Sequence, residues 1–150
     1  MDVLQPCAWC MGDVVIEVVD GELNPEALMA SLHTSGSGAV VSFLGIVRDF
    51  DDGEEVLRLE FDAWKERLEP VLRRLAEQSK ELHGVSSIAI AHRVGIVGPG
   101  KPIVSIHVAS PHRKEAFESC SWLIDELKSQ APLWKKEVKP SGMVWKAGLG

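Results

Sequence analysis

The chain has 150 residues, enough for one domain with a sizeable core, and its apolar fraction of 45% and charged fraction of 25% are ordinary for a globular protein. Its net charge of −6 disfavours a nucleic-acid partner, because such affinity comes mostly from neutralised phosphates. No apolar run approaches the roughly 18 residues of a membrane span, and the first residues lack the basic region of a secretion signal. We therefore expect no nucleic-acid partner, no membrane partner and a cytoplasmic location.

The first twelve residues are expected to form an N-terminal extension, ahead of a single domain over residues 13–150. Cys7 and Cys10 form a CxxC motif in this extension, before the first predicted strand rather than after a strand as in thioredoxin-like sites. Zinc would need about two more ligands, for example from a second subunit, so an extension without metal is the simpler interpretation. No metal site is predicted.

The first half of the domain alternates strands and helices. Residues 14–19 predict a strand, Asn24 and Pro25 begin a short helix, and the apolar run 39–48 predicts a central strand buried on both faces. The acidic stretch 49–55 predicts a turn before a strand over 56–61. Apolar residues three and four apart then predict a helix over about 65–83, which Pro70 is expected to kink or delay.

The second half adds strands over 87–94 and 102–109, joined by a hairpin connection. A long helix over 111–129 is expected to start with Ser110 as its N-cap and to expose Trp122 on the side away from the sheet. Extended segments near 133–138 and 143–147 complete an α+β fold, with helices packed on a mixed, largely antiparallel sheet. The apolar stripe of the long helix comprises Ala116, Phe117, Cys120, Leu123, Ile124 and Leu127.

Basic residues are concentrated near the C-terminus. Residues 101–150 hold eight Lys and Arg against five Asp and Glu, whereas residues 1–100 hold eight against seventeen. A histidine, an arginine and a lysine, His112, Arg113 and Lys114, stand at the start of the long helix, where the helix dipole disfavours positive charge. Free backbone N–H groups and an arginine suit a phosphate at this position, and the alternative is a solvated first turn.

Four more lysines follow within twelve residues. Lys135 and Lys136 point to opposite faces if residues 133–138 are extended, so one can enter a pocket while the other stays in water. A desolvated lysine near other cations has a lowered pKa and becomes a usable acid, base or nucleophile. Spacing alone leaves Lys136 and Lys139 as ordinary surface residues.

Four segments stand in order along the chain: GAVVSFLGIVRD, HRVGIVGPG, VASPHRKEAFESCSWLIDELK and APLWKKE. Together they resemble the catalytic (large) subunit of molybdopterin synthase over about residues 13–147. The resemblance implies an α/β-hammerhead fold and a sulfurtransferase that converts cyclic pyranopterin monophosphate into molybdopterin in molybdenum cofactor biosynthesis. It implies no metal and no redox cofactor for this step.

The resemblance also implies partners. The sulfur donor would be a small ubiquitin-like subunit whose C-terminal Gly-Gly ends in a thiocarboxylate, bound to a homodimer of large subunits within a heterotetramer. The family pocket mixes residues from both large subunits, so basic residues of one copy are expected to serve the lysines of the other. By resemblance the catalytic residues are Lys128 and Lys135, and the substrate-binding residues are Arg48, His112, Arg113 and the neighbouring Lys136.

Two other interpretations stay open. The chain could be a non-catalytic binding module for a ubiquitin-like Gly-Gly tail or a small phosphorylated ligand, or it could be a sensor of small anions or nucleotides. The presence of both Lys128 and Lys135 argues against simple docking, which needs charge but not those two positions. The chain also ends soon after Trp145, where many relatives add a basic residue, and Lys146 is the candidate substitute.

Overall fold

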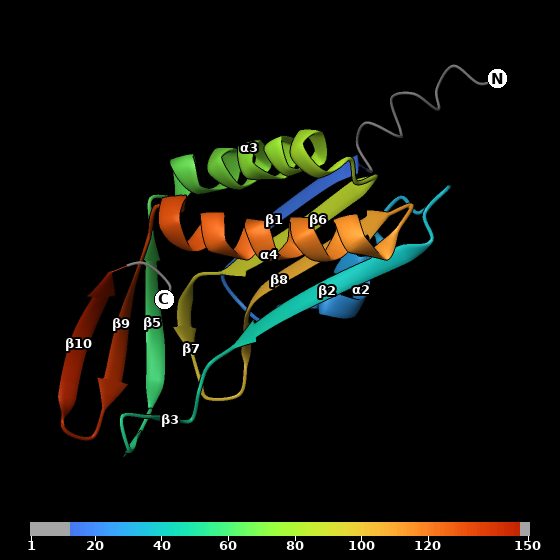
Figure 1. Ribbon diagram of the computed structural model, residues 1–150. Coiled ribbons are helices and arrows are strands. Elements are labelled where there is room, and N and C mark those ends of the chain that lie inside the picture. The colour runs from blue at the N-terminus through green and yellow to red at the C-terminus, as the bar shows by residue number, and fades with distance from the viewer. Residues whose placement is uncertain (1–12, 148–150) are drawn as a thin grey trace.

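A computed structural model of the protein describes residues 13–147 (Figure 1). Cys7 and Cys10 lie outside the described residues, so the division into an extension and one domain remains a prediction. The elements in chain order are β1 (Val14–Val19), α2 (Pro25–Ala30), β2 (Ala39–Ile46), β3 (Phe50–Asp51), β4 (Glu54–Glu55), β5 (Arg58–Ala63), α3 (Lys65–His83), β6 (Ser87–Arg93), β7 (Gly95–Val97), β8 (Pro102–Ser110), α4 (Arg113–Gln130), β9 (Leu133–Lys139) and β10 (Gly142–Ala147).

Two four-stranded sheets form the frame of the molecule. The first has the order β1-β6-β8-β2, with β1 parallel to β6 and the other pairs antiparallel. The second has the order β10-β9-β5-β7 and is antiparallel throughout. Helices α3 and α4 lie side by side on one face of the first sheet, and α2 lies on the other (Figure 1). This architecture confirms the predicted α+β class with a mixed, largely antiparallel sheet.

The main core lies between the first sheet and the α3–α4 layer. Its largest fully buried side chains include Leu68, Leu72 and Leu75 from α3, and Leu123 and Leu127 from α4. Burying each of these leucines stabilises the fold by roughly 1.5–3 kcal/mol relative to exposure. The core therefore fixes the position of α4, whose last turn carries a residue of the candidate site.

Helix α3 begins at Lys65, so Pro70 does not delay its start. Proline lacks a backbone N–H and removes only one hydrogen bond, near the first turn of a 19-residue helix. The helix ends at Gly84, whose left-handed backbone (φ 68°) lets its N–H donate to the carbonyl of Lys80 at 2.9 Å.

Strand β2 corrects the expectation of a central strand, because it lies at the edge of the first sheet. Val41 and Phe43 pack against the core, whereas Val40, Leu44 and Ile46 on the other face are 42–52% exposed. An apolar run predicts burial on both faces but cannot tell whether the covering layer belongs to the same chain. An exposed apolar edge of this kind is typical of a surface that meets another chain.

The start of α4 also differs from the prediction. Ser110 is the last residue of β8, where it pairs with Ala39 and accepts a hydrogen bond from Gly38 N–H on its carbonyl. His112 takes the N-cap position with extended backbone and makes no side-chain cap hydrogen bond. Pairing in the sheet therefore takes precedence over the capping preference of Ser110.

The burial of two aromatic side chains of α4 is the reverse of the prediction, which buried Phe117 and exposed Trp122. Phe117 is 60% exposed, whereas Trp122 packs on the margin of the core with its ring 5.8 Å from that of His83. The reason is that α4 packs against α3 as well as against the sheet. The buried face of α4 therefore extends toward α3. Cys120 is buried, as predicted.

The connections after β2 and β6 join the two sheets. Residues 50–55 form a small β3–β4 hairpin, whose central residues Asp52 and Gly53 both have positive φ (53° and 74°), as a type I′ turn requires. The connection between β6 and β8 contains β7, which pairs with β5 of the second sheet. Both connections border the candidate site described below.

Candidate functional site

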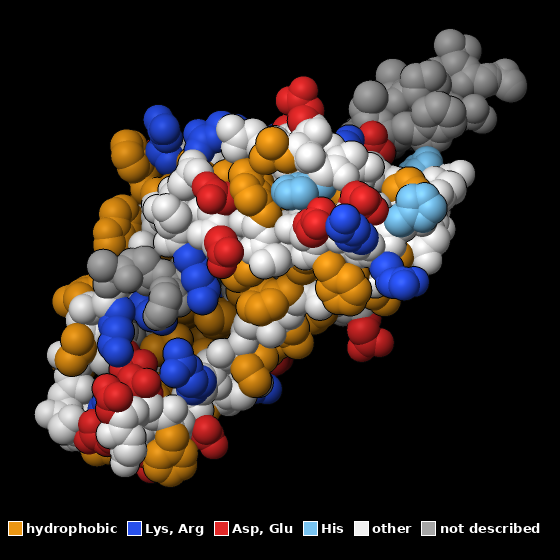
Figure 2. Space-filling model, viewed as in Figure 1, with side chains coloured by type: hydrophobic (Ala, Val, Ile, Leu, Met, Phe, Trp, Pro, Cys, Tyr) orange, Lys and Arg blue, Asp and Glu red, His pale blue; other side chains and the backbone are white. Residues whose placement is uncertain are grey.

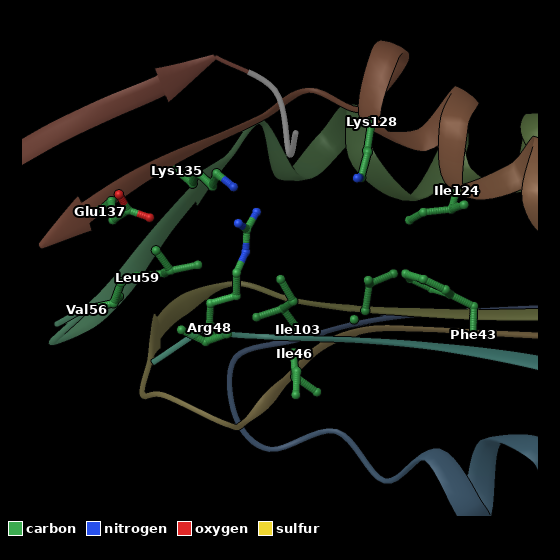
Figure 3. Close-up of a pocket in the computed structure, with 13 residues that line it drawn as sticks. Phe43, Ile46, Arg48, Val56, Leu59, Ile103, Ile124, Lys128, Lys135 and Glu137 are labelled. Carbon is green, nitrogen blue, oxygen red and sulfur yellow. The ribbon is translucent and has the colours of Figure 1, made fainter. Parts of the chain in front are cut away.

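A cavity of about 170 Å³ lies where the end of β2, the end of α4 and the second sheet meet (Figure 3). Most of its wall is apolar, including Phe43, Ile46, Leu59, Ile103 and Ile124. The charged groups in its lining are Arg48, Lys128, Lys135 and Glu137. An apolar cleft with a few converging charged groups is typical of a ligand site, and three positive groups against one carboxylate favour an anionic ligand.

The turn after α4 brings two lysines to this cavity. Lys128 lies in the last turn of α4, and the helix stops at Ala131, whose extended backbone reverses the chain while its N–H still donates to the carbonyl of Leu127. Strand β9 then runs back past the cavity and presents Lys135. In Figure 3 the guanidinium of Arg48 and the amine of Lys135 lie close together, and the amine of Lys128 points toward the same cavity from the end of α4. The structure thus brings together three of the six site residues predicted from the sequence.

Lys135 is almost completely buried, with 8% of its surface exposed. Burial is the main cause that lowers the pKa of its ammonium below the usual 10.5, Glu137 opposes this shift, and Lys146, Arg48 and Lys128 lower the pKa further. A lysine with a lowered pKa has a larger neutral fraction near neutral pH. It can therefore exchange a proton more readily than a surface lysine.

Lys136 occupies the opposite face of β9, as the alternation of an extended strand predicts. Its amine forms an ion pair with Glu60 at 3.2 Å and lies 5.2 Å from the centre of the Trp145 ring. Lys136 does not line the cavity, so its predicted part in substrate binding has no geometric support within one chain.

His112 and Arg113 lie at the other end of α4, exposed to solvent. Fifteen residues separate Arg113 from Lys128, which corresponds to about 22 Å along the helix axis. Within one chain, the predicted phosphate-binding turn and the lysine cavity are therefore separate.

Two residues lie close to Lys135 beyond the six predicted: Glu137, which the sequence reasoning did not place, and Lys146, which it named only as a candidate substitute for a basic residue. Glu137 lies two residues after Lys135 on the same face of β9, and it is also 8% exposed. Its Oε1 lies 3.3 Å from Lys139 Nζ and 3.4 Å from Lys146 Nζ. The i, i+2 spacing from Lys135 was the available signal for Glu137, whereas Lys146 is brought in by pairing of β10 with β9.

Three other titratable groups, two histidines and a cysteine, have structural roles. His92 is completely buried, and burial lowers its pKa to about 4, so its ring is neutral at physiological pH. His107 lies between the hydroxyls of Ser42 and Ser105, each 2.6 Å from one ring nitrogen. Burial raises the pKa of the Cys120 thiol to about 11, which makes it a poor nucleophile.

Two features, a cluster of metal ligands and a membrane-spanning helix, are absent from the described residues. Residues 13–147 contain no group of three or more His, Cys, Asp or Glu placed to hold a metal ion. Within the same range, no helix has both the length and the apolar character that crossing a membrane demands.

Fold and site together define a class: an α+β protein with a cavity on which two lysines and an arginine converge between apolar side chains. The model of the MoaE protein family matches residues 18–130 of the chain. The molybdopterin synthase catalytic subunit of Pseudomonas aeruginosa is 37% identical over 137 residues, covering 90% of this chain and 91% of that protein. The corresponding subunit of Thermoplasma volcanium is 34% identical over 132 residues, covering 88% and 96%.

Solved structures agree with these matches. Molybdopterin synthase from Staphylococcus aureus superposes with a TM-score of 0.83 at 31% identity, covering 87% of this chain and 95% of that one. A complex of subunits 1 and 2 of molybdopterin-converting factor from Helicobacter pylori matches with a TM-score of 0.70 at 25% identity, covering 87% and 88%. The chain belongs to the MoaE protein family. The predicted family and the predicted enzyme class, a molybdopterin synthase catalytic subunit, are confirmed.

Proposed function

We propose that the chain converts cyclic pyranopterin monophosphate into molybdopterin, taking sulfur from the C-terminal thiocarboxylate of a small ubiquitin-like subunit. The observation that carries this proposal is the convergence of Lys128, Lys135 and Arg48 on one cavity. Both the substrate phosphate and the thiocarboxylate are anions, and preorganised cations offset their charge and hold them close together. The cytoplasm is the expected compartment.

Each cation has a role that follows from its surroundings. Lys135, with its lowered pKa, would transfer protons as the sulfur attacks and the acyl group leaves. Lys128 and Arg48 would stabilise the anionic groups during the same step. A binding module without catalysis would gain nothing from burying Lys135, because burial weakens the charge that docking requires.

The narrow cavity supports a glycine-ended tail as the sulfur donor. Glycine has no side chain, so an extended Gly-Gly segment fits between apolar walls that would exclude larger residues. The related structure from Helicobacter pylori is a complex of two subunits, which supports a small partner subunit for this chain. We propose that such a tail enters the cavity and places its terminal sulfur beside Lys135.

Edge strand β2 supports a homodimer within a heterotetramer. The start of β2 lies beside the β8–α4 junction, since Ala39 pairs with Ser110, and its end leads to Arg48. Antiparallel pairing of β2 with a second copy would put the start of one strand beside the end of the other. In that arrangement His112 and Arg113 of the second copy would approach the cavity and could bind the substrate phosphate at the helix N-terminus.

Sulfur transfer in a purified system tests the proposed function. The chain is mixed with a thiocarboxylated partner and cyclic pyranopterin monophosphate, and molybdopterin is followed as its fluorescent oxidation product. We expect product from the parent chain and losses of about a hundredfold or more, or roughly 3 kcal/mol, in Lys128→Ala and in Lys135→Ala. Lys101→Ala is the matched control, since Lys101 is exposed, forms an ion pair with Glu22 and does not line the cavity. No product from a parent chain that still binds the partner would leave a docking module.

A further inference from the structure

Asp51, on the β3–β4 hairpin, is surrounded by three cations, one of which, Arg48, lines the cavity. Its Oδ2 lies 3.2 Å from Lys139 Nζ and 3.4 Å from Lys146 Nζ, and its Oδ1 lies 3.6 Å from Arg48 Nη1. Lys139 also donates to the backbone carbonyl of Asp51 at 3.2 Å. These contacts connect the hairpin to the segment after β2, to β9 and to β10. In Figure 2, acidic and basic side chains gather at this end of the molecule.

The same two lysines also contact Glu137, which lines the cavity beside Lys135. Asp51, Lys139, Glu137 and Lys146 thus form a closed ring in which positive and negative groups alternate. Asp51 reaches the cavity in two ways, directly through Arg48 and indirectly through the lysines that contact Glu137. It does not line the cavity itself.

A second contact holds the hairpin independently of this ring. Glu54 accepts hydrogen bonds from the backbone N–H of Ser141 at 3.1 Å and from its hydroxyl at 2.8 Å. Glu54 and Asp51 therefore lie on one hairpin and both attach it to the β9–β10 hairpin. Within residues 13–147, Asp51 forms ion pairs with Arg48, Lys139 and Lys146, whereas Glu54 forms none with these cations. The pair offers a matched comparison.

We propose that Asp51 is a positioning residue, which holds Arg48 and Lys146 in place so that the anionic substrate meets cations already oriented toward the cavity. This inference rests on the proposed function, because it assigns a role in that reaction. Long cationic side chains lose orientation when they lose their partner, and ordering them again on binding reduces affinity. Orientation of groups around the reacting atoms then decides the rate.

Charge and position make opposite predictions for Asp51→Asn. The change removes one negative charge near an anion site, so a purely electrostatic role predicts tighter substrate binding and equal or higher activity. A positioning role predicts weaker binding despite the more positive surroundings. The direction of the change in KM therefore separates the two roles.

The first experiment compares kcat and KM of the parent, Asp51→Asn, Asp51→Glu and Glu54→Gln with a saturating thiocarboxylated partner. We expect Asp51→Asn to lower kcat/KM between tenfold and about a hundredfold, mainly through a higher KM. Asp51→Glu should recover part of the loss, and Glu54→Gln should match the parent although it removes the same charge from the same hairpin. A kcat/KM for Asp51→Asn equal to or above the parent value overturns the inference, as does an equal loss in Glu54→Gln.

The second experiment does not depend on activity. The same four proteins are acetylated with a limiting amine-reactive reagent, and mass spectrometry measures labelling of Lys139 and Lys146. We expect a severalfold increase for both lysines in Asp51→Asn and no change in Glu54→Gln. Unchanged labelling in Asp51→Asn overturns the inference. If the parent chain makes no product, the proposed function fails, and the labelling alone decides whether Asp51 holds the two lysines.

Discussion

Replacing Lys135 by methionine separates the reactivity of this lysine from its effect on stability. Methionine keeps the length and apolar stem of lysine but removes the ammonium, and Lys135 lies opposite Phe61 on the buried face of the second sheet. Loss of a proton-transferring group predicts a fall in kcat of about a hundredfold or more, or roughly 3 kcal/mol of transition-state stabilisation. Glu137 keeps its contacts with Lys139 and Lys146 in this variant.

The same variant should be more stable than the parent. Burial lowers the pKa of Lys135, which means that the folded state disfavours its charged form. Removing that charge should raise the free energy of unfolding by about 0.5–1 kcal/mol and Tm by a few degrees. Sulfur transfer measures the first effect, and calorimetry on the same protein measures the second.

The pH dependence gives the sign of the stability effect. Between the lowered pKa of folded Lys135 and its ordinary value of 10.5 in the unfolded chain, the unfolded state binds more protons, so the parent gains stability as pH rises. The advantage of Lys135→Met is therefore complete below the lowered pKa and shrinks as pH approaches 10.5. A variant less stable than the parent at pH 7, or an advantage that grows with pH, would refute this reasoning. Either result would mean that partners of the ammonium outweigh its burial.

Three further predictions concern the surroundings of Lys135. Lys146 lowers the pKa of Lys135, so Lys146→Gln should move the inflection of the pH–rate profile to higher pH. Glu137 raises the pKa of Lys135, so Glu137→Gln should move the inflection to lower pH. Shifts of both variants in the same direction would contradict this. Lys136→Ala should keep a kcat/KM at least about tenfold higher than that of Lys135→Ala, since the amine of Lys136 lies on the opposite face of β9. An equal mixture of the inactive variants Lys135→Ala and Arg113→Ala should recover about a quarter of parent activity, because half of randomly exchanged dimers are mixed and each has one intact site. No recovery after subunit exchange, followed by mass, would exclude a site shared between copies.

Local pattern predicted the elements and one decisive orientation. Strand alternation assigned Lys135 and Lys136 to opposite faces, and the structure buries the first and leaves the second beside Glu60. Such a prediction succeeds because side-chain direction along a strand depends only on the backbone. The bounds of β1 were predicted to the residue and those of α3 approximately, because the signals for both elements are local.

Tertiary coverage could not be predicted in the same way. Val40, Leu44 and Ile46 look like core residues in the sequence, but whether a layer covers them depends on elements far along the chain or on another chain. Asp51 lies in an acidic stretch typical of a solvated turn, yet it meets Lys139 and Lys146, which are 88 and 95 residues away. Only the folded arrangement brings such groups together.

For the basic turn at the start of α4, local pattern predicted the kind of ligand, but the surroundings of the turn depend on tertiary and quaternary structure. The sequence indicated an anion there, because His112 and Arg113 place positive charge where the helix dipole disfavours it. One chain places these residues about 22 Å along the axis from Lys128, too far to share a substrate. The proposed two-fold axis across β2 would remove this distance, since it would set the start of one strand beside the end of its copy. The unfavourable charges at the helix start and the exposed apolar edge of β2 then have one explanation, a site completed by the second copy.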